Sequence, residues 1–234
     1  MGGVIYHSRD AKERLSHAKG VVWDLDNTLY RVDKILEEHF HLSVARAVVA
    51  AGIKMSLEEA QDMARLSSEK YGQNAQIFID RYGLNIRSVH EEYHDYSDEK
   101  LIKANEEICN LFAQQNLQHA LVTHASRGWA NRVLAHLGLT RWIKPENVFG
   151  LENFDFQAKY EHSAGFDRAL KSLDMKAGET LMIEDSLRNL QIPHKMGMAT
   201  VLIHHGQKPE IPPGFLDMSC ANAVDFMTVL NETR

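Results

Sequence analysis

The sequence predicts an α/β fold, in which a mostly parallel sheet is interrupted by an inserted α-helical segment. Two observations carry this prediction. From about residue 98 onward, short apolar runs alternate with helical patterns, as is typical of parallel strands joined by crossover helices. Between residues 33 and 96 the apolar residues recur at helical spacing and the strand pattern is lost. The composition, 44% hydrophobic and 25% charged over 234 residues, is that of an ordinary globular protein.

The first predicted strand is an apolar run over residues 21–23 that ends abruptly in Asp24 and Asp26. Such a run suits a strand buried on both faces, and ligands of open α/β sheets bind outside the carboxyl ends of these strands. If the alternation of the strand persists, the two carboxylates point the same way. Their repulsion then raises one pKa unless a hard cation such as Mg²⁺ compensates it. The alternative is a turn in which Asp side chains accept bonds from nearby backbone amides.

The insertion is expected to contain four helices that form a small bundle. Apolar residues at helical spacing predict the first helix, which ends before Gly52. Ser56 and Glu59 match a capping box, which predicts the start of a second helix that ends near Gly72. Two shorter helices follow, the last of them over residues 87–96.

The remaining elements follow the helix–strand alternation. Strands are predicted at residues 119–123, 148–149, 180–183 and 199–203, with helices that end near residues 116, 137, 173 and 195. A Pro-rich turn over 209–213 and a last helix over 222–230 close the sequence. The strand at 21–23 therefore belongs to the same sheet as the strands that follow residue 98.

Polar residues stand at the ends of several of these elements. Thr123 closes a strand, and its hydroxyl with nearby amides could hold a phosphate oxygen at a helix N-terminus, although a helix cap is the alternative. Lys159 stands at a helix entry, where the dipole disfavours a lysine unless it serves an anion; a solvated surface lysine is the alternative. Glu184 and Asp185 end another apolar strand. Two strands tipped by carboxylates predict a shared metal site.

With these four segments in this order, the chain resembles the haloacid dehalogenase-like (HAD) superfamily of phosphohydrolases. The resemblance implies a Rossmann-like core made of residues 1–29 and 98–234, with a helical C1 cap over residues 30–97. It also implies that Asp24 is the nucleophile and that Asp26 is the general acid and base. Thr123 and Lys159 would bind the phosphoryl group.

The resemblance further implies a Mg²⁺ site and marks two departures from the family pattern. Asp24, the backbone carbonyl of Asp26, and Asp185 would hold Mg²⁺, with Glu184 contributing directly or through water. His124 follows Thr123 where relatives often have Asn, and Tyr160 follows Lys159 where Pro is common. His124 is therefore also expected among the phosphate-binding residues, because this departure touches the substrate contacts.

Within the superfamily, the segments 24–30, 184–190 and 197–202 look most like the pyrimidine 5'-nucleotidase branch. This resemblance implies a Mg²⁺-dependent phosphomonoester hydrolase that forms an aspartyl-phosphate, acting on a nucleoside 5'-monophosphate or a similar small phosphate ester. A phosphoglycolate or sugar-phosphate phosphatase of the same fold is the alternative. Phe78, Tyr82 and Tyr93 could stack on a base, although aromatic residues at helical spacing are more often bundle core.

One competing pattern points to another enzyme class. Residues 90–94 satisfy H-E-x-x-H, in which His90 and His94 would bind zinc and Glu91 would be the general base of a metallopeptidase. Charged neighbours favour an exposed helix face instead, and no obvious third ligand follows. A catalytically silent binding module of the HAD fold is a further alternative, which the retained acids and Lys159 argue against.

Composition limits the partners. The net charge of −6 and the lack of a Lys/Arg stripe argue against nucleic acid and leave a small phosphorylated metabolite as the expected partner. Two cysteines are too few for a disulfide framework, and the N-terminal residues lack the apolar core of a signal peptide. No apolar run approaches the length that a membrane span needs. We therefore expect a cytoplasmic monomer or homodimer without a membrane role.

Overall fold

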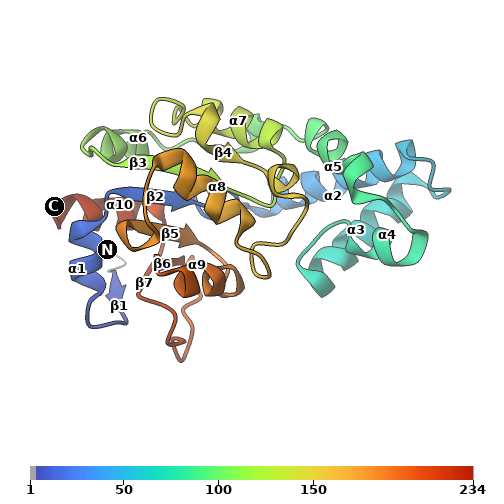
Figure 1. Cartoon of the computed structure of the whole chain (residues 1–234). Coiled ribbons are helices and arrows are strands. Elements are labelled where there is room, and N and C mark those ends of the chain that lie inside the picture. Colours follow the sequence, from blue (N-terminus) through green and yellow to red (C-terminus); the bar gives the residue numbers. More distant parts are fainter. Residues whose placement is uncertain (1–3, 234) are drawn as a thin grey trace. The chain divides into compact units, whose positions relative to one another are not determined.

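A seven-stranded sheet organises the larger part of the chain in the computed structural model, which describes residues 4–233 (Figure 1). The strand order is β1-β7-β6-β5-β2-β3-β4, and every neighbouring pair is parallel except β1 with β7. The strands are β1 (Ile5–Tyr6), β2 (Gly20–Trp23), β3 (Gln118–Val122), β4 (Val148–Phe149), β5 (Thr180–Glu184), β6 (Ala199–Ile203) and β7 (Met218–Cys220). The predicted α/β fold with a mostly parallel sheet is confirmed.

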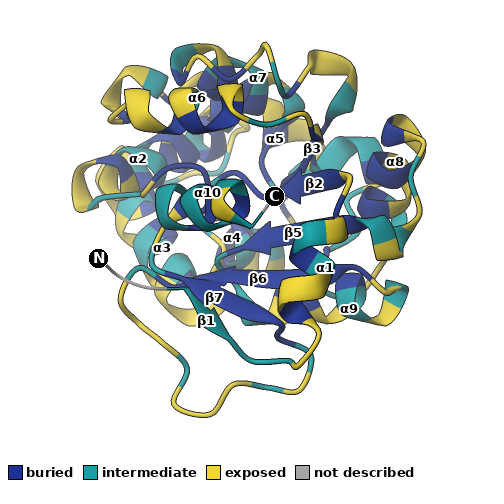
Figure 2. Cartoon of the chain, turned by 90° about the vertical axis from the view of Figure 1, so that its left-hand side faces the viewer, coloured by how far each residue is buried: buried dark blue, intermediate teal, exposed yellow. Residues whose placement is uncertain are grey.

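Six α-helices accompany the sheet in the same compact unit, which holds the described residues up to Arg31 and those from Lys103 onward. They are α1 (Ala11–His17), α6 (Glu106–Ala113), α7 (Arg127–His136), α8 (Ala164–Leu173), α9 (Gln191–Met196) and α10 (Ala223–Glu232). Short 3₁₀ turns lie at η2 (Pro145–Asn147), η3 (Leu151–Phe154), η4 (Ala177–Glu179) and η5 (Leu187–Leu190). Strands β2, β5 and β6 are buried along their whole length (Figure 2).

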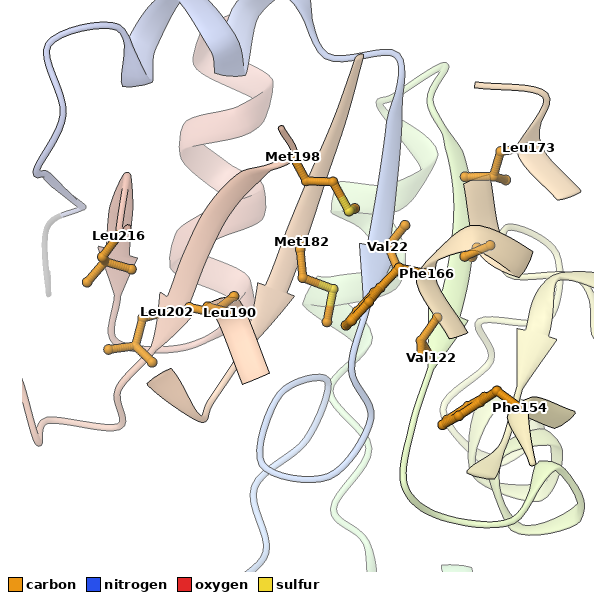
Figure 3. Close-up of a cluster of buried hydrophobic side chains, with 12 residues drawn as sticks. Val22, Val122, Phe154, Phe166, Leu173, Met182, Leu190, Met198, Leu202 and Leu216 are labelled. Atoms are coloured by element: carbon orange, nitrogen blue, oxygen red, sulfur yellow. The ribbon is translucent and has the colours of Figure 1, made fainter. Parts of the chain in front are cut away.

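The sheet is buried because apolar side chains cover both of its faces. On one face, Val22 of β2 and Met182 of β5 belong to a core cluster that also contains Phe166 of α8 (Figure 3). On the other face, the ring of Trp23 lies 5.5 Å from that of Phe112 in α6 and 5.6 Å from that of Phe226 in α10, measured between centroids. Alternation along one strand thus sends successive side chains into two cores. The packing of β2 on both faces therefore fixes the end of this strand and the position of Asp24, which follows it directly.

The second compact unit, Val32–Ile102, is helical. Its helices are α2 (Lys34–Ala50), α3 (Leu57–Tyr71), α4 (Gln76–Tyr82) and α5 (Ile86–Asp95), followed by the 3₁₀ turn η1 (Glu99–Leu101). The predicted capping box is present, since the Ser56 hydroxyl accepts from the amide of Glu59 and the Glu59 carboxylate accepts from the amide of Ser56. Gly72 ends α3 with φ at 67°, a left-handed conformation that glycine adopts without strain. Among residues 4–233, no helix is long and apolar enough to cross a membrane.

Besides the 3₁₀ turns, the helix and strands that were not predicted from the sequence are α1, β1 and β7. The edge strand β1 has two residues and its neighbour β7 has three, too few to show an alternation. Their place depends on Asp217, which pairs with Arg14 at 2.9 Å and accepts from the amide of Thr200 at 2.9 Å. These partners lie far from Asp217 in the sequence, so no local pattern identifies them.

Candidate active site

The site lies at the carboxyl ends of the three central strands. β2 is paired with β3 on one side and with β5 on the other, and the chain returns across the sheet between β4 and β5. Asp24 directly follows β2, Thr123 directly follows β3, and Glu184 is the last residue of β5. The amide of Asp24 continues the ladder by donating to the carbonyl of Ile183 at 2.9 Å. This is the point where the strand order reverses, at which open α/β sheets bind their ligands.

Lys159 connects the acidic residues of the site. Its Nζ lies 2.5 Å from Oδ1 of Asp24, 2.7 Å from Oε2 of Glu184 and 3.3 Å from the carbonyl oxygen of Val122. The side chain is buried, so the alternative of a solvated surface lysine does not apply. Burial alone would lower the pKa of the Lys159 amine, but the carboxylates of Asp24 and Glu184 outweigh it and raise that pKa. The amine therefore stays charged as a buried cation between two strand ends.

The two oxygens of Asp24 have different partners. Oδ1 accepts from Lys159, and Oδ2 accepts from the hydroxyl of Thr28 at 3.0 Å. Thr28 is buried and belongs to the turn that follows Asp24. Both oxygens are thus held in place before any substrate arrives. The hydroxyl of Thr28 is a contact that sequence analysis did not single out, although Thr28 lies within the same short polar segment.

The carboxylates of Asp24, Glu184 and Asp185 form a cluster, with one oxygen from each within 4.8 Å of the others. Burial, reinforced by the charge of Glu184, raises the pKa of Asp24 to about 7. Burial and the neighbouring charges of Glu184 and Asp24 raise the pKa of Asp185 to about 9. Burial alone would also raise the pKa of Glu184, but the Lys159 ammonium outweighs burial, so the pKa of Glu184 is lowered. One lysine therefore does not compensate three acids, and these oxygens fit a hard divalent cation such as Mg²⁺.

Asp26 faces a different partner. Its Oδ1 accepts a hydrogen bond from the hydroxyl of Tyr30, and its side chain is not part of the three-carboxylate cluster. Burial raises the pKa of Asp26, whereas Tyr30 and the Trp129 indole act to lower it. The two acids of the opening strand thus lie in distinct surroundings, although one residue separates them. Sequence analysis missed Tyr30 and Trp129; the position of Tyr30 directly after the polar segment was the only available signal.

Thr123 is buried, and its hydroxyl accepts from the amide of Ala125 at 3.0 Å. The N-cap of α7 is Ser126, so Thr123 is not the helix cap that was its alternative role. The amide of Arg127, at the start of α7, donates to the Glu152 carboxylate at 2.8 Å. The chain's own carboxylate thus occupies part of the helix N-terminus that was expected to receive a phosphate oxygen.

His124 and Tyr160, the two residues that depart from the family pattern, contact each other. Nε2 of His124 accepts from the backbone amide of Lys159 at 2.9 Å, and its ring meets that of Tyr160 edge-on at 6.3 Å between centroids. The guanidinium carbon of Arg188 lies 3.3 Å from the centroid of the Tyr160 ring. His124 therefore holds the backbone of the residue whose ammonium contacts Asp24. This contact does not follow from the sequence, because 35 residues separate the two partners.

The H-E-x-x-H segment lies on α5, and the expected exposed face is wrong for its two histidines. His90 and His94 are buried, 4.9 Å apart between ring centroids, whereas Glu91 and Asp95 are exposed. The charged neighbours occupy the other side of the same helix. Among residues 4–233, the only cluster of three or more potential metal ligands is that of Asp24, Glu184 and Asp185, so the pair lacks a third zinc ligand.

Fold and site together define an α/β protein with acids and a lysine gathered at its strand ends, and comparison with known proteins identifies the family. The haloacid dehalogenase-like hydrolase family matches residues 18–197, more than half of the sequence, and the chain belongs to it. Hydrolases of this family use Mg²⁺, which the three-carboxylate cluster fits. No curated protein sequence matches significantly.

Solved structures share the fold at low sequence identity. The HAD hydrolase YfnB of Bacillus subtilis, bound to magnesium, is 17% identical with a TM-score of 0.59, covering 92% of this chain and 99% of that one. CbbY of Rhodobacter sphaeroides, in complex with phosphate, is 16% identical with a TM-score of 0.63 and coverages of 88% and 94%. A protein from Haemophilus somnus, described as a predicted phosphoglycolate phosphatase, is 18% identical with a TM-score of 0.61 and coverages of 91% and 98%.

Proposed function

We propose that this chain is a Mg²⁺-dependent phosphomonoesterase that hydrolyses small phosphate esters through an aspartyl-phosphate on Asp24. The observation that carries the proposal is the buried ammonium of Lys159, held 2.5 Å from Asp24 and 2.7 Å from Glu184. A carboxylate attacks a phosphate dianion only where cations neutralise the repulsion between them. Lys159 supplies one cation at the nucleophile itself, and the acid cluster beside it fits a second.

The first half of the reaction forms the phosphoenzyme. One oxygen of Asp24 attacks phosphorus, the bond from phosphorus to the ester oxygen breaks, and the carboxyl proton of Asp26 moves to that leaving oxygen. Lys159 balances the charge on the phosphoryl oxygens, and Thr28 keeps the Asp24 carboxylate from rotating. We assign Thr123 to the phosphoryl group through its hydroxyl, and His124 to positioning Lys159.

The second half returns the enzyme to its starting state. Asp26, now ionised, takes a proton from the water that attacks the phosphoryl group, and the bond to Asp24 breaks to release phosphate. Covalent catalysis of this kind divides one slow hydrolysis into two easier steps. When bound by Asp24, the backbone carbonyl of Asp26, and Asp185, with Glu184 directly or through water, Mg²⁺ neutralises the phosphoryl oxygens.

For the leaving group, we propose that the helical unit Val32–Ile102 is a C1 cap that sets specificity. The segments 24–30 and 184–190 favour a nucleoside 5'-monophosphate, in the manner of the pyrimidine 5'-nucleotidase branch. The fold shared with the Haemophilus somnus protein and with a putative β-phosphoglucomutase from Thermotoga maritima gives comparable support to phosphoglycolate or a sugar phosphate. Phe78 is fully buried in the bundle core and Tyr93 packs against that core, so among the three aromatic candidates base stacking falls to the exposed Tyr82.

Phosphate release from a substrate panel tests the proposal. The panel contains pyrimidine and purine 5'-monophosphates, flavin mononucleotide, hexose phosphates and phosphoglycolate, each with Mg²⁺ and with EDTA. We expect Mg²⁺-dependent release that EDTA abolishes, and no release by Asp24→Asn as the matched control. Release that persists in EDTA or in Asp24→Asn would contradict the proposal. Strong preference for phosphoglycolate or a hexose phosphate would overturn the nucleotidase assignment and leave the phosphatase intact.

A further inference from the structure

Tyr30 lies at the end of the turn that carries the acid Asp26. The turn is held by hydrogen bonds from the amides of Thr28 and Leu29 to the carbonyl of Leu25, and Asn27 adopts φ at 57° within it. Asp26 and Tyr30 come back together as an isolated backbone bridge, which places the two side chains alongside each other. Tyr30 is 6% exposed, and its hydroxyl donates to Oδ1 of Asp26. The contact is thus built by the backbone of the turn and enclosed by packing.

The contact has a consequence for the chemistry of a carboxylic acid. A phenol is a hydrogen-bond donor at neutral pH, and a carboxyl group has two oxygens that are equivalent while it rotates freely. The Tyr30 hydroxyl donates to Oδ1, so the two oxygens are not equivalent here, and a proton on Oδ2 would leave Oδ1 free to accept from Tyr30. Proton transfer depends on geometry to a few tenths of an ångström, because donor and acceptor must meet at hydrogen-bond distance.

We propose that Tyr30 is a positioning residue for the general acid and base, whose hydroxyl fixes the Asp26 carboxyl group so that Oδ2 gives and takes the transferred proton. The inference rests on the proposed phosphatase function and adds a residue to its machinery. The hydroxyl of Tyr30 donates to Asp26, which is outside the cluster of Asp24, Glu184 and Asp185. If Tyr30 acts through Asp26 alone, replacing it should slow only those steps of the reaction that need proton transfer.

The leaving group provides the test. An aryl phosphate releases a weakly basic phenolate that needs no proton, whereas an alkyl phosphate releases a strongly basic alkoxide that does. For Tyr30→Phe we expect kcat/KM on an alkyl phosphate to fall about 10- to 100-fold, no more than the smaller part of the 10²–10⁴ that general acid catalysis contributes, because the acid itself is kept. We expect kcat/KM on p-nitrophenyl phosphate to fall less than about 3-fold. Turnover of the aryl ester should still slow, with phosphoenzyme accumulating, because breakdown needs Asp26 as base.

A double-variant cycle separates positioning from stability. If Tyr30 acts through Asp26, adding Tyr30→Phe to Asp26→Asn should cause no further loss on the alkyl phosphate. Tyr6→Phe, in β1 at the far edge of the sheet, is the matched control and should leave both substrates unaffected. If Tyr30→Phe lowered kcat/KM equally on both esters, the positioning role would be overturned. The same holds if the double variant lost more kcat/KM on the alkyl phosphate than Asp26→Asn alone. A wild-type protein that releases phosphate from neither ester would instead overturn the proposed function.

Discussion

Replacing Lys159 by Met should destabilise the sheet-bearing unit far more than replacing a surface lysine in an equally short ion pair. The Lys159 ammonium is 2.5 Å from Asp24 and 2.7 Å from Glu184, and these three side chains are between 1% and 7% exposed. Removing one partner of a buried pair leaves uncompensated buried charge, at a cost of about 3–5 kcal/mol. Met keeps the length of the aliphatic chain, so the loss of packing is small.

The assay is urea unfolding followed by tryptophan fluorescence, at pH 8 and in EDTA. All three tryptophans, Trp23, Trp129 and Trp142, lie in the sheet-bearing unit, so the signal reports on that unit alone. EDTA removes divalent cations that would neutralise the same carboxylates. The matched control is Lys19→Met, whose amine is 2.6 Å from Glu179 but 65% exposed. A pair of that kind contributes less than about 1 kcal/mol.

The effect of Lys159→Met should also depend on pH. Without the lysine, the folded-state pKa of Asp24, already raised to about 7, rises further, and that of Glu184, which Lys159 keeps low, rises above its unfolded value. The destabilisation is therefore complete above the folded pKa values and is relieved as the pH falls through them and the acids take up protons. This reasoning would be refuted if Lys159→Met and Lys19→Met lowered the free energy of unfolding equally at pH 8. It would also be refuted if the destabilisation by Lys159→Met grew as the pH is lowered.

Three further predictions concern other residues. Asp26→Asn should lower phosphatase turnover by about 10² to 10⁴, the usual contribution of an acid or base, and Asp24→Asn should lower it further, as steady-state assays would show. Burial lowers the pKa of His119 to about 3, so the stability of wild type relative to His119→Gln should fall by about 1.4 kcal/mol per pH unit below pH 6.5 in urea titrations. Purified protein should contain no stoichiometric zinc by elemental analysis, and His90→Gln with His94→Gln should leave Mg²⁺-dependent phosphate release intact.

The order and type of most elements could be predicted from the sequence because the sheet is buried on both faces. Apolar runs at residues 148–149 and 199–203 coincide with β4 and β6, and the capping box at Ser56 marks the start of α3. The edge strand β1 and its neighbour β7 could not be predicted, because their few residues follow no local pattern and their place depends on Asp217. The burial of His90 was misjudged because charge was counted along α5 without separating its two faces.

From the sequence alone, only those residues of the candidate site that lie at the ends of strands could be predicted to come together. Asp24, Glu184 and Asp185 lie together because parallel strands bring their carboxyl ends to one edge, which a sequence can indicate. The contact of Lys159 with Asp24 spans 135 residues, and the family resemblance implied only that Lys159 would bind the phosphoryl group. The partners Tyr30 of Asp26 and His124 of Lys159 depend on the path of turns, which apolar periodicity does not encode.

The identity of the nucleophile is the central claim, and trapping the phosphoenzyme tests it most directly. Wild-type protein is mixed with substrate and Mg²⁺, quenched in acid within a single turnover, digested and mapped by mass spectrometry. We predict one phosphoryl adduct, on the peptide that contains Asp24 and at that residue, formed and lost at rates compatible with turnover. An adduct at another residue, or active protein without any adduct throughout a time course that resolves the turnover, would contradict the account.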